Sequence, residues 1–362
     1  MRPKLYLLLL LIATSLVMAS TQEAALKKFK IVKQIAVTPV KDQSSSSTCW
    51  SFGTISFIES ELLRMGNGEW DLSEMFIARQ VYRDKAIVHV RMMGSNCFTP
   101  GGQSHQVMQA IEQHGIVPET YYNGRPYGNA DHNHALLDQA AKNLVGQYVK
   151  DEQQLLPAHW IAGFDAILDR HLGVLPQTLD YQGKKYTPRL FAQEVLALHP
   201  KDYLEITSYT HHPFYTKFCL ETKYNWDFGQ YHNVPIEDFM AIIDNALNTG
   251  YSVCWDGDVT ETAFSFDQGM ATVPAYEGKV TQALRQQTFD NRSTQVDHIM
   301  HITGIAENQS GERYYLTKNS WGPINLYQGY LYLSLSYVKL KTVAIMVHRQ
   351  AIPAHIAKKM GL

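Results

Sequence analysis

The period at which apolar residues recur changes along this chain, from a helical period in the first half to a two-residue period near the C-terminus. Phe52, Ile55 and Ile58 begin the first helical pattern, and Gly66 is a typical helix stop. Helices first and antiparallel strands last predict an α+β fold. The predicted helices span 49–66, 72–90, 103–114, 135–149, 188–198 and 236–249, and the predicted strands span 251–255, 298–305, 314–318, 329–333 and 343–348.

Residues from about 126 to 205 differ in character from the segments on either side. Helical patterns at 135–149 and 188–198 are joined by polar and proline-containing turns. We interpret this stretch as a helical insertion into a main domain that spans 20–350. Residues 351–362 then form a C-terminal tail.

Residues 1–19 have the features of a secretory signal peptide. Arg2 and Lys4 precede a leucine-rich apolar run over 5–17, and small residues end the segment at Ala19. The run is shorter than the ~20 residues that a membrane span needs, which makes an uncleaved anchor the weaker alternative. We therefore expect an exported protein, secreted or periplasmic, with no membrane contact after cleavage.

The composition restricts the partners of the mature chain. Lys and Arg number 32 against 34 Asp and Glu, so no strongly basic face is expected and we expect no nucleic-acid partner. Four cysteines are too few for a disulfide scaffold, even in the oxidising space that an exported protein enters. At least one cysteine is therefore expected to have a reason to stay free.

Cys49 stands at the start of the first predicted helix, after a loop of serines. Cysteine attacks a carbonyl as its thiolate, which a helix N-terminus and a nearby imidazolium both stabilise. Gln43 is placed to reach round the loop and donate its side-chain N–H to a developing oxyanion, with the backbone N–H of Cys49 as the second donor. A buried structural cysteine is the alternative.

Two later segments contain the groups that would activate such a thiol. His298 opens a predicted strand and is placed to face a cleft as a general base. His301 points to the opposite face of that strand, which argues against a metal site shared by the two histidines. Asn319 can accept the imidazole N–H and hold the tautomer that pairs with sulfur, while Trp321 covers that bond from water. An exposed histidine and an ordinary turn are the alternatives for these segments taken singly.

Jointly, the three segments resemble the papain superfamily of cysteine peptidases. The resemblance rests on Val37-Thr38-Pro39-Val40-Lys41-Asp42-Gln43, Cys49-Trp50-Ser51-Phe52, Asp297-His298 with Gly304, and Lys318-Asn319-Ser320-Trp321-Gly322. It implies a papain-like fold with a helical half and an antiparallel β half. The site residues that it implies are Cys49 as nucleophile, His298 as base, Asn319 as orienting group, Gln43 in the oxyanion hole, Trp321 in support, and Gly101 and Gly102 as the binding site for the substrate backbone.

The spacing of the motifs points to one branch of that superfamily. His298 and Asn319 follow Cys49 by about 250 and 270 residues, against ~130–150 in papain-like enzymes. The excess matches the helical insertion, and an insertion of that kind resembles the bleomycin hydrolase and aminopeptidase C branch. This resemblance implies an aminopeptidase, a homo-oligomer, and a C-terminus inside the cleft that limits cleavage to chain ends, a role for Met360-Gly361-Leu362 here.

Some features depart from the family pattern. Ser47 stands where the family usually has glycine. Ser45 and Ser46 stand where secreted members carry a disulfide cysteine and its neighbour, so the oxyanion loop has no covalent brace and its rigidity is left open. The branch is usually cytosolic, whereas this chain carries an export signal. The segment between Ala19 and Val37 is too short for a folded inhibitory propeptide.

We expect a cofactor-free cysteine peptidase that hydrolyses peptide substrates through a thioester acyl-enzyme and is aminopeptidase-like. The alternatives are an exported endopeptidase with an open cleft, a peptide-binding protein on a retired peptidase fold, and a metal-binding export protein. The joint presence of Cys49, His298, Asn319 and Gln43 argues against a retired site.

The remaining cysteines and paired histidines receive structural interpretations. Cys97, Cys219 and Cys254 lie in apolar or aromatic surroundings and are expected to pack in the core. His132-Asn133-His134 and His211-His212 have no cysteine or carboxylate at a ligand spacing, so we predict solvated loops and no metal site.

Overall fold

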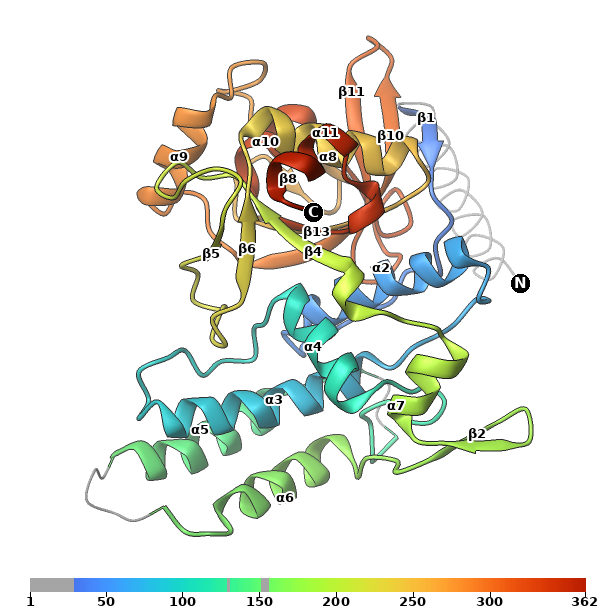
Figure 1. Ribbon diagram of the computed structural model, residues 1–362, viewed down its shortest axis with the longest axis vertical. Coiled ribbons are helices and arrows are strands. Elements are labelled where there is room, and N and C mark those ends of the chain that lie inside the picture. Colours follow the sequence, from blue (N-terminus) through green and yellow to red (C-terminus); the bar gives the residue numbers. More distant parts are fainter. Residues whose placement is uncertain (1–28, 129–130, 151–155) are drawn as a thin grey trace, which may run out of the picture.

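The structure is a computed structural model that describes residues 29–128, 131–150 and 156–362. The predicted signal peptide, residues 1–19, lies outside the described residues. In the described part of the chain, no helix is both long and apolar enough to cross a membrane. Figure 1 shows the helices of the first half of the chain below a second half that is built on one large sheet.

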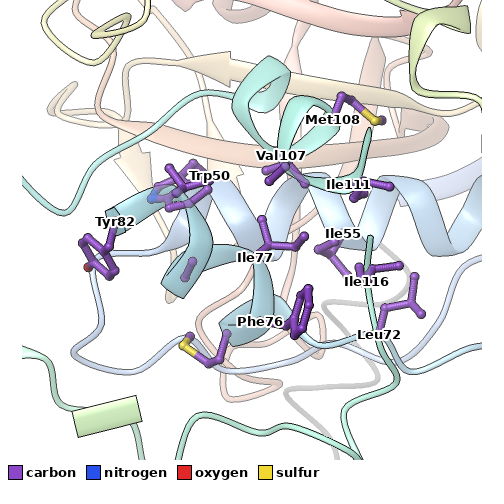
Figure 2. Packing of buried hydrophobic residues seen from close by; sticks show 14 of the residues in the cluster. Trp50, Ile55, Leu72, Phe76, Ile77, Tyr82, Val107, Met108, Ile111 and Ile116 are labelled. Atoms are coloured by element: carbon purple, nitrogen blue, oxygen red, sulfur yellow. The ribbon is translucent and has the colours of Figure 1, made fainter. Parts of the chain in front are cut away.

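Three helices form the centre of the helical half. Ile55, Ile77 and Val107, one from each helix, meet in a buried apolar cluster (Figure 2). Gly66 adopts the left-handed conformation that ends the first helix, and the Ser73 hydroxyl caps the second. The helices predicted at 49–66, 72–90 and 103–114 are confirmed as α2 (Cys49–Met65), α3 (Glu74–Arg91) and α4 (Ser104–His114).

The segment predicted as an insertion packs into the same cluster as the three central helices. Leu137, Phe164 and Phe191 from this segment are fully or almost fully buried there. The segment therefore extends the core of the helical half. Its elements are α5 (Ala135–Lys150), α6 (Trp160–Leu172), β2 (Leu179–Tyr181), β3 (Lys184–Tyr186), α7 (Pro188–Leu190), the π-helical turn η1 (Phe191–Val195) and the 3-10 turn η2 (Pro200–Asp202).

The helix predicted at 188–198 is only partly correct. Thr187 caps a helical start at Pro188, but the backbone widens into the π-helical turn at Phe191. The Phe191 ring is fully buried against Trp70 and Tyr181, so aromatic packing decides the local backbone here more than helical period does.

Eleven strands of the described chain form the large sheet, in the order β5-β6-β4-β13-β7-β10-β11-β12-β9-β8, with β1 paired to β10. Most neighbours are antiparallel, and a turn at 308–311 joins β10 to β11. The strands are β1 (Phe29–Gln34), β4 (Tyr203–Thr207), β5 (Lys217–Cys219), β6 (Gln230–Asn233), β7 (Val253–Gly257), β8 (Phe264–Ser265), β9 (Met270–Ala271), β10 (His298–Asn308), β11 (Arg313–Lys318), β12 (Tyr330–Ser334) and β13 (Thr342–His348).

Helices cover the sheet on the side away from the helical half. The apolar face of α8 (Ile236–Asn248), which confirms the helix predicted at 236–249, packs on Trp255 and Met300. The other elements of this half are α9 (Gln282–Asp290), α10 (Leu335–Lys341), η3 (Arg349–Ala351) and α11 (Ala354–Met360). The tail at 351–362 belongs to this layer, because Ile356 and Met360 are buried in the same cluster.

Helix α2 crosses the middle of the sheet at β10, with Gly53 at the point of contact. A Cβ atom at Gly53 would lie 2.8 Å from the carbonyl oxygen of Ile299, so any larger residue would push the helix off the strand. This close approach brings the first residue of α2, Cys49, to the first residue of β10, His298.

Candidate active site

A cleft of about 310 Å³ lies where the helical half meets the sheet. Segments far apart in the chain line it together: the loop before α2, the loop before α4, one loop after β5, the start of β10 and the turn after β11. The lining residues are Gln43, Ser47, Cys49, Thr99, Pro100, Gly101, Gly102, Tyr224, Val296, Asp297, His298, Ile299 and Trp321.

Cys49 is partly exposed in this cleft as the first residue of α2. The backbone N–H groups of Ile299 and Trp50 lie close to its sulfur, and both act to lower the pKa of the thiol. The residue next to the predicted base therefore touches the predicted nucleophile. The free N–H groups and the positive end of the helix dipole also favour negative charge on the sulfur.

The imidazole of His298 is held by two neighbours. Its Nε2 lies 2.7 Å from Oδ1 of Asn319, and because that oxygen can only accept, Nε2 carries the proton. The Trp321 ring stands 4.6 Å from the imidazole, centroid to centroid, and covers this bond. Asn319 is itself fixed, since its backbone N–H donates to the carbonyl of Gly329 at 3.1 Å. The Nδ1 atom of His298 is left for the sulfur.

The two reacting groups favour their uncharged forms when each is considered alone. Burial raises the pKa of the Cys49 thiol to about 12, against the effect of the Ile299 N–H. Burial lowers the pKa of His298 to about 4, against the hydrogen bond to Asn319, which raises it. Each pKa shift reflects the free-energy cost of placing a single charge, the thiolate or the imidazolium, in a poorly solvated site. Proton transfer from thiol to imidazole creates both charges together, and their attraction in a poorly solvated site opposes that cost.

Gln43 is oriented by a residue that the sequence analysis did not single out. The Ser320 hydroxyl donates to Oε1 of Gln43 at 2.7 Å, and the Gln43 backbone N–H donates to the carbonyl of Ser320 at 2.8 Å. With its oxygen occupied, the Gln43 amide has its Nε2 donor left for an oxyanion in the cleft. The one sequence feature that could have indicated this role is the position of Ser320 between two predicted site residues, Asn319 and Trp321.

The serine loop before Cys49 is braced by hydrogen bonds. Ser45 pairs with the 132–134 segment: its N–H donates to the His132 carbonyl at 3.0 Å, and its carbonyl accepts from the His134 N–H at 3.1 Å. Ser47 adopts φ 57°, the left-handed conformation that explains a family preference for glycine at this position. The prediction of a solvated loop at 132–134 is wrong, because the side chains of His132 and His134 are only 8% and 4% exposed.

The glycine pair forms the rim of the cleft and tolerates no side chain. A Cβ atom on Gly101 would lie 2.4 Å from the Tyr224 ring, and one on Gly102 would lie 2.6 Å from the Trp50 ring. Beneath the rim, the buried ammonium of Lys85 donates to the carbonyls of Thr99 and Gly101. Tyr224 and Lys85 were missed by sequence reasoning, because neither lies in a motif.

The prediction that three cysteines pack in the core is correct for Cys254, which is fully buried near the hydroxyls of Thr54 and Ser104. It is wrong for Cys97 and Cys219, which are free thiols of intermediate exposure. His301 faces α2, where its Nδ1 lies 2.9 Å from the Ser56 hydroxyl.

A thiol at a helix start, an imidazole and a carboxamide from the sheet, and a cleft between the two halves define a papain-type cysteine peptidase. The chain belongs to the Peptidase C1-like family, whose profile matches residues 177–361, just over half of the chain. Residues 26–160 match the papain family cysteine protease profile. The chain is thus a cysteine-type peptidase, a hydrolase, as the sequence motifs predict.

Individual relatives place the chain within that class. Aminopeptidase C of Listeria monocytogenes is 22% identical over 88% of this chain and 81% of its own length. Bleomycin hydrolase of Gallus gallus is 20% identical over 89% of this chain and 82% of its own length. The crystal structure of PepW from Lactobacillus rhamnosis has the same fold, with a TM-score of 0.74 at 17% identity over 94% of this chain and 86% of that one. The predicted bleomycin hydrolase and aminopeptidase C branch and the α+β papain-like fold are confirmed.

Proposed function

We propose that this peptidase is an aminopeptidase, which releases residues from the N-terminus of peptides through a thioester on Cys49. The observation that carries the proposal is the wall that Tyr224 forms beside Gly101. The leaving amine departs beside His298, which protonates it, so the retained part of the substrate lies along the glycine rim. A wall there leaves room for few residues before the scissile bond.

The proposed reaction proceeds in two stages. His298 takes the thiol proton as the sulfur of Cys49 attacks the carbonyl carbon, and the oxyanion receives hydrogen bonds from Gln43 Nε2 and the Cys49 N–H. The intermediate collapses, the C–N bond breaks, and His298 gives its proton to the leaving amine. Water then attacks the thioester with His298 as base, which releases the carboxylic acid and restores the thiol.

Charge in the cleft also suits a peptide N-terminus. Asp297 is the one charged side chain in the described lining. Its Oδ1 accepts from the Val259 N–H at 2.9 Å, and its buried Oδ2 accepts no N–H or O–H within the described residues, while the Asp258 carboxyl lies beside it. Burial raises the pKa of this carboxyl to about 7, so an approaching ammonium group favours the ionised form. Several related proteins over most of this length are also named aminopeptidases.

A matched peptide set tests the end specificity. We expect kcat/KM for a peptide with a free N-terminus to exceed that for its N-acetylated twin by at least about tenfold, because the acetylated end loses a charge-assisted contact and adds bulk at the wall. Tyr224→Ala is expected to raise cleavage of the acetylated peptide, whereas the control Tyr224→Phe, which keeps the ring, behaves as wild type. Equal rates for the two peptides would instead identify an endopeptidase.

The C-terminal tail sharpens this test. The branch resemblance implies that the chain end limits cleavage, but residues 351–362 pack near α8 and contribute none of the described lining. Truncation after Ile352 would not test the end specificity, because it would remove the buried Ile356 and disturb the packing of this half. Tyr224 lines the cleft and is therefore the residue to substitute.

We further propose that the peptidase is exported. The support is the predicted signal peptide at 1–19, with its basic start and apolar run. N-terminal sequencing of the protein from its native source is expected to begin near Ser20. A mature chain that still begins at Met1 or Arg2, recovered from the cytoplasm, would contradict export.

A further inference from the structure

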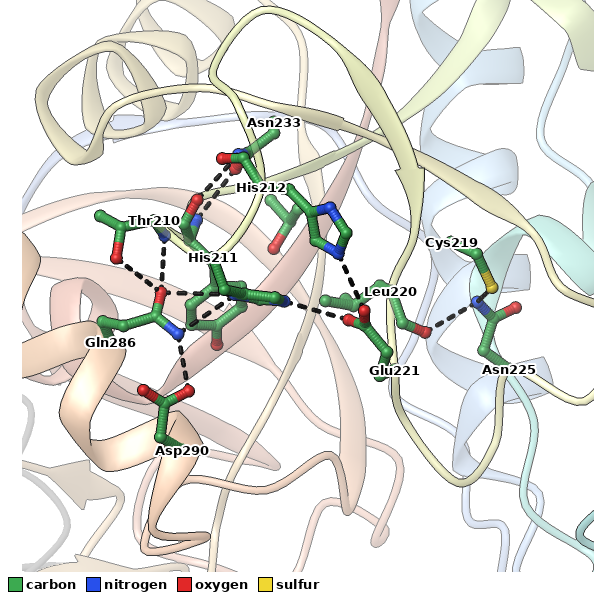
Figure 3. A network of polar contacts seen from close by, with 12 residues as sticks. Thr210, His211, His212, Cys219, Leu220, Glu221, Asn225, Asn233, Gln286 and Asp290 are labelled. Carbon is green, nitrogen blue, oxygen red and sulfur yellow. Dashed lines mark hydrogen bonds and ion pairs between the residues drawn. The ribbon is translucent and has the colours of Figure 1, made fainter.

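A second cluster of chemically active side chains lies outside the peptidase cleft. His211 and His212 occupy the turn after β4, and Glu221 follows β5 (Figure 3). The carboxylate lies between the two rings: His211 Nε2 is 3.0 Å from Glu221 Oε2, and His212 Nε2 is 2.9 Å from Oε1. No carboxylate stands at a ligand spacing from these histidines in the sequence, but the fold brings Glu221 to them from ten residues beyond His211.

The two imidazoles are held in place by aromatic packing. The His212 ring stacks on Phe218 at 4.2 Å with planes 24° apart. The His211 ring lies parallel to Phe289, at 5.8 Å and 20°. Both Nε2 atoms therefore point to the same carboxylate without depending on it for their orientation.

His211 also has a partner on its far nitrogen. The Gln286 side chain contacts His211 Nδ1, with its Nε2 at 3.1 Å and its Oε1 at 3.5 Å. Gln286 is in turn fixed by Thr210, whose N–H donates to Oε1 at 2.6 Å, and by Asp290, which accepts from Nε2 at 2.7 Å (Figure 3). In this arrangement the amide Nε2 of Gln286 is the nearer contact and donates to Nδ1. A metal ion on His211 Nε2 requires the proton on Nδ1, so binding would make the amide oxygen, which lies 3.5 Å away, the acceptor of that proton.

We propose that His211, His212 and Glu221 form a binding site for one divalent transition-metal ion of the zinc class. Two imidazoles and one carboxylate are a donor set that zinc, cobalt and nickel ions accept, with a fourth position left for water or another ligand. Calcium and magnesium ions prefer oxygen donors alone, so this site discriminates against them.

The donor geometry suits such an ion after a small adjustment. The three ligand atoms lie within 4.8 Å of one another. Tetrahedral coordination with bonds of ~2.0–2.1 Å sets donor atoms about 3.4 Å apart. Glu221 can make this adjustment, because its side chain is 55% exposed and free to turn. His211 and Glu221 also line a cavity of about 560 Å³, which gives the ion a solvent-filled approach.

Metal binding is expected to restrict the motion of the loop that carries Tyr224, which forms one wall of the peptidase cleft. Glu221 begins the loop that carries Tyr224 to Gly101, and Asn225 closes that loop by donating to the carbonyls of Leu220 and Gly229 at 2.9 and 3.0 Å. The cavity beside the metal site and the cleft share Val296 as a wall. A bound ion would link the loop that carries Tyr224 to the turn after β4, without itself contacting the Cys49 thiol.

The test measures metal binding directly in the full chain with Cys49→Ala, because the catalytic thiol would otherwise compete for the ion. We expect one equivalent of Co²⁺ to bind with the visible absorption of nitrogen and oxygen coordination, and Zn²⁺ to displace it. Glu221→Gln, which keeps the shape of the side chain, and His212→Ala are each expected to weaken binding by at least about tenfold. The matched control is His355→Ala, an exposed histidine on α11, which should leave binding unchanged.

Two readouts separate this proposal from simpler explanations. Saturating Zn²⁺ should raise the melting temperature of the Cys49→Ala protein but not that of the Cys49→Ala/Glu221→Gln protein. If Co²⁺ binds with equal strength in both proteins, or does not bind at all, the cluster is an ion pair of two histidines with a carboxylate and the metal site is refuted. Neither readout uses turnover, so failure of the proposed aminopeptidase function would leave this result unaffected.

Discussion

Replacement of Cys49 by serine is expected to lower kcat/KM for peptide hydrolysis by about 10⁴-fold or more. Serine keeps the shape of the side chain, but its hydroxyl is a far weaker acid than a thiol. The helix start, the Ile299 N–H and the imidazole that together favour a thiolate do not suffice to ionise it. The measurement is kcat/KM on a fluorogenic peptide with a free N-terminus, with wild type and variant at equal concentration.

The loss must be chemical and not structural for this result to assign the nucleophile. The free energy of unfolding of the Cys49→Ser protein should lie within about 0.5 kcal/mol of that of wild type, because the substitution changes one atom at a partly exposed position. Labelling by a thiol-directed epoxide supplies the control, and wild type should react where Cys49→Ser does not, although both retain Cys97. A variant with more than a tenth of wild-type turnover would show that another group attacks. If wild type neither turns over nor labels, the retired peptide-binding protein becomes the better description.

The parts of this structure that the sequence predicts are those governed by local pattern. Helix α2 has a helical period and strand β10 is a continuous run of apolar and small residues, and the predicted bounds of both agree with the observed ones to within a few residues. Helix α6 carries a comparable signal in Phe164, Leu168 and Leu172, but the polar and proline-containing sequence around it directed attention to turns. The short strands β4 to β6 have three to five residues each, too few for a period to be decisive.

Features that depend on contacts between distant segments were not predictable in this way. Backbone pairing between Ser45 and the 132–134 segment holds the loop that a disulfide holds in secreted family members, yet no pattern in either segment predicts this pairing. The same holds for Tyr224 at the glycine rim and for Glu221 beside the paired histidines. The motifs around Cys49 and His298 were found because the chemistry itself requires those residue types in a recognisable order. The supporting residues satisfy packing and hydrogen bonding, which many sequences can meet.

Replacement of His298 by alanine is expected to reduce kcat/KM by about 10⁴-fold, and replacement of Asn319 by alanine to reduce it by about 10²-fold. His298 both accepts the thiol proton and protonates the leaving amine, so its loss removes two proton transfers. Asn319 takes no part in proton transfer: its Oδ1 accepts from the imidazole at 2.7 Å and from the Ser320 N–H at 2.8 Å. Its loss leaves the proton carrier in place but less well oriented. The two variants are compared with wild type on the same free-ended peptide.

The pH profile distinguishes an orienting role for Asn319 from general damage to the fold. The hydrogen bond from His298 to Asn319 raises the pKa of the imidazole, against the lowering by burial. Without it, the imidazolium of the catalytic pair holds its proton less well, so that proton is lost at lower pH. The alkaline limb of the kcat/KM profile, where activity falls as the imidazolium deprotonates, should therefore move to lower pH in Asn319→Ala. A variant that is slower at every pH by the same factor would show that Asn319 supports the turn without tuning the base. A His298→Ala protein with near-normal rates would remove the imidazole from the mechanism altogether.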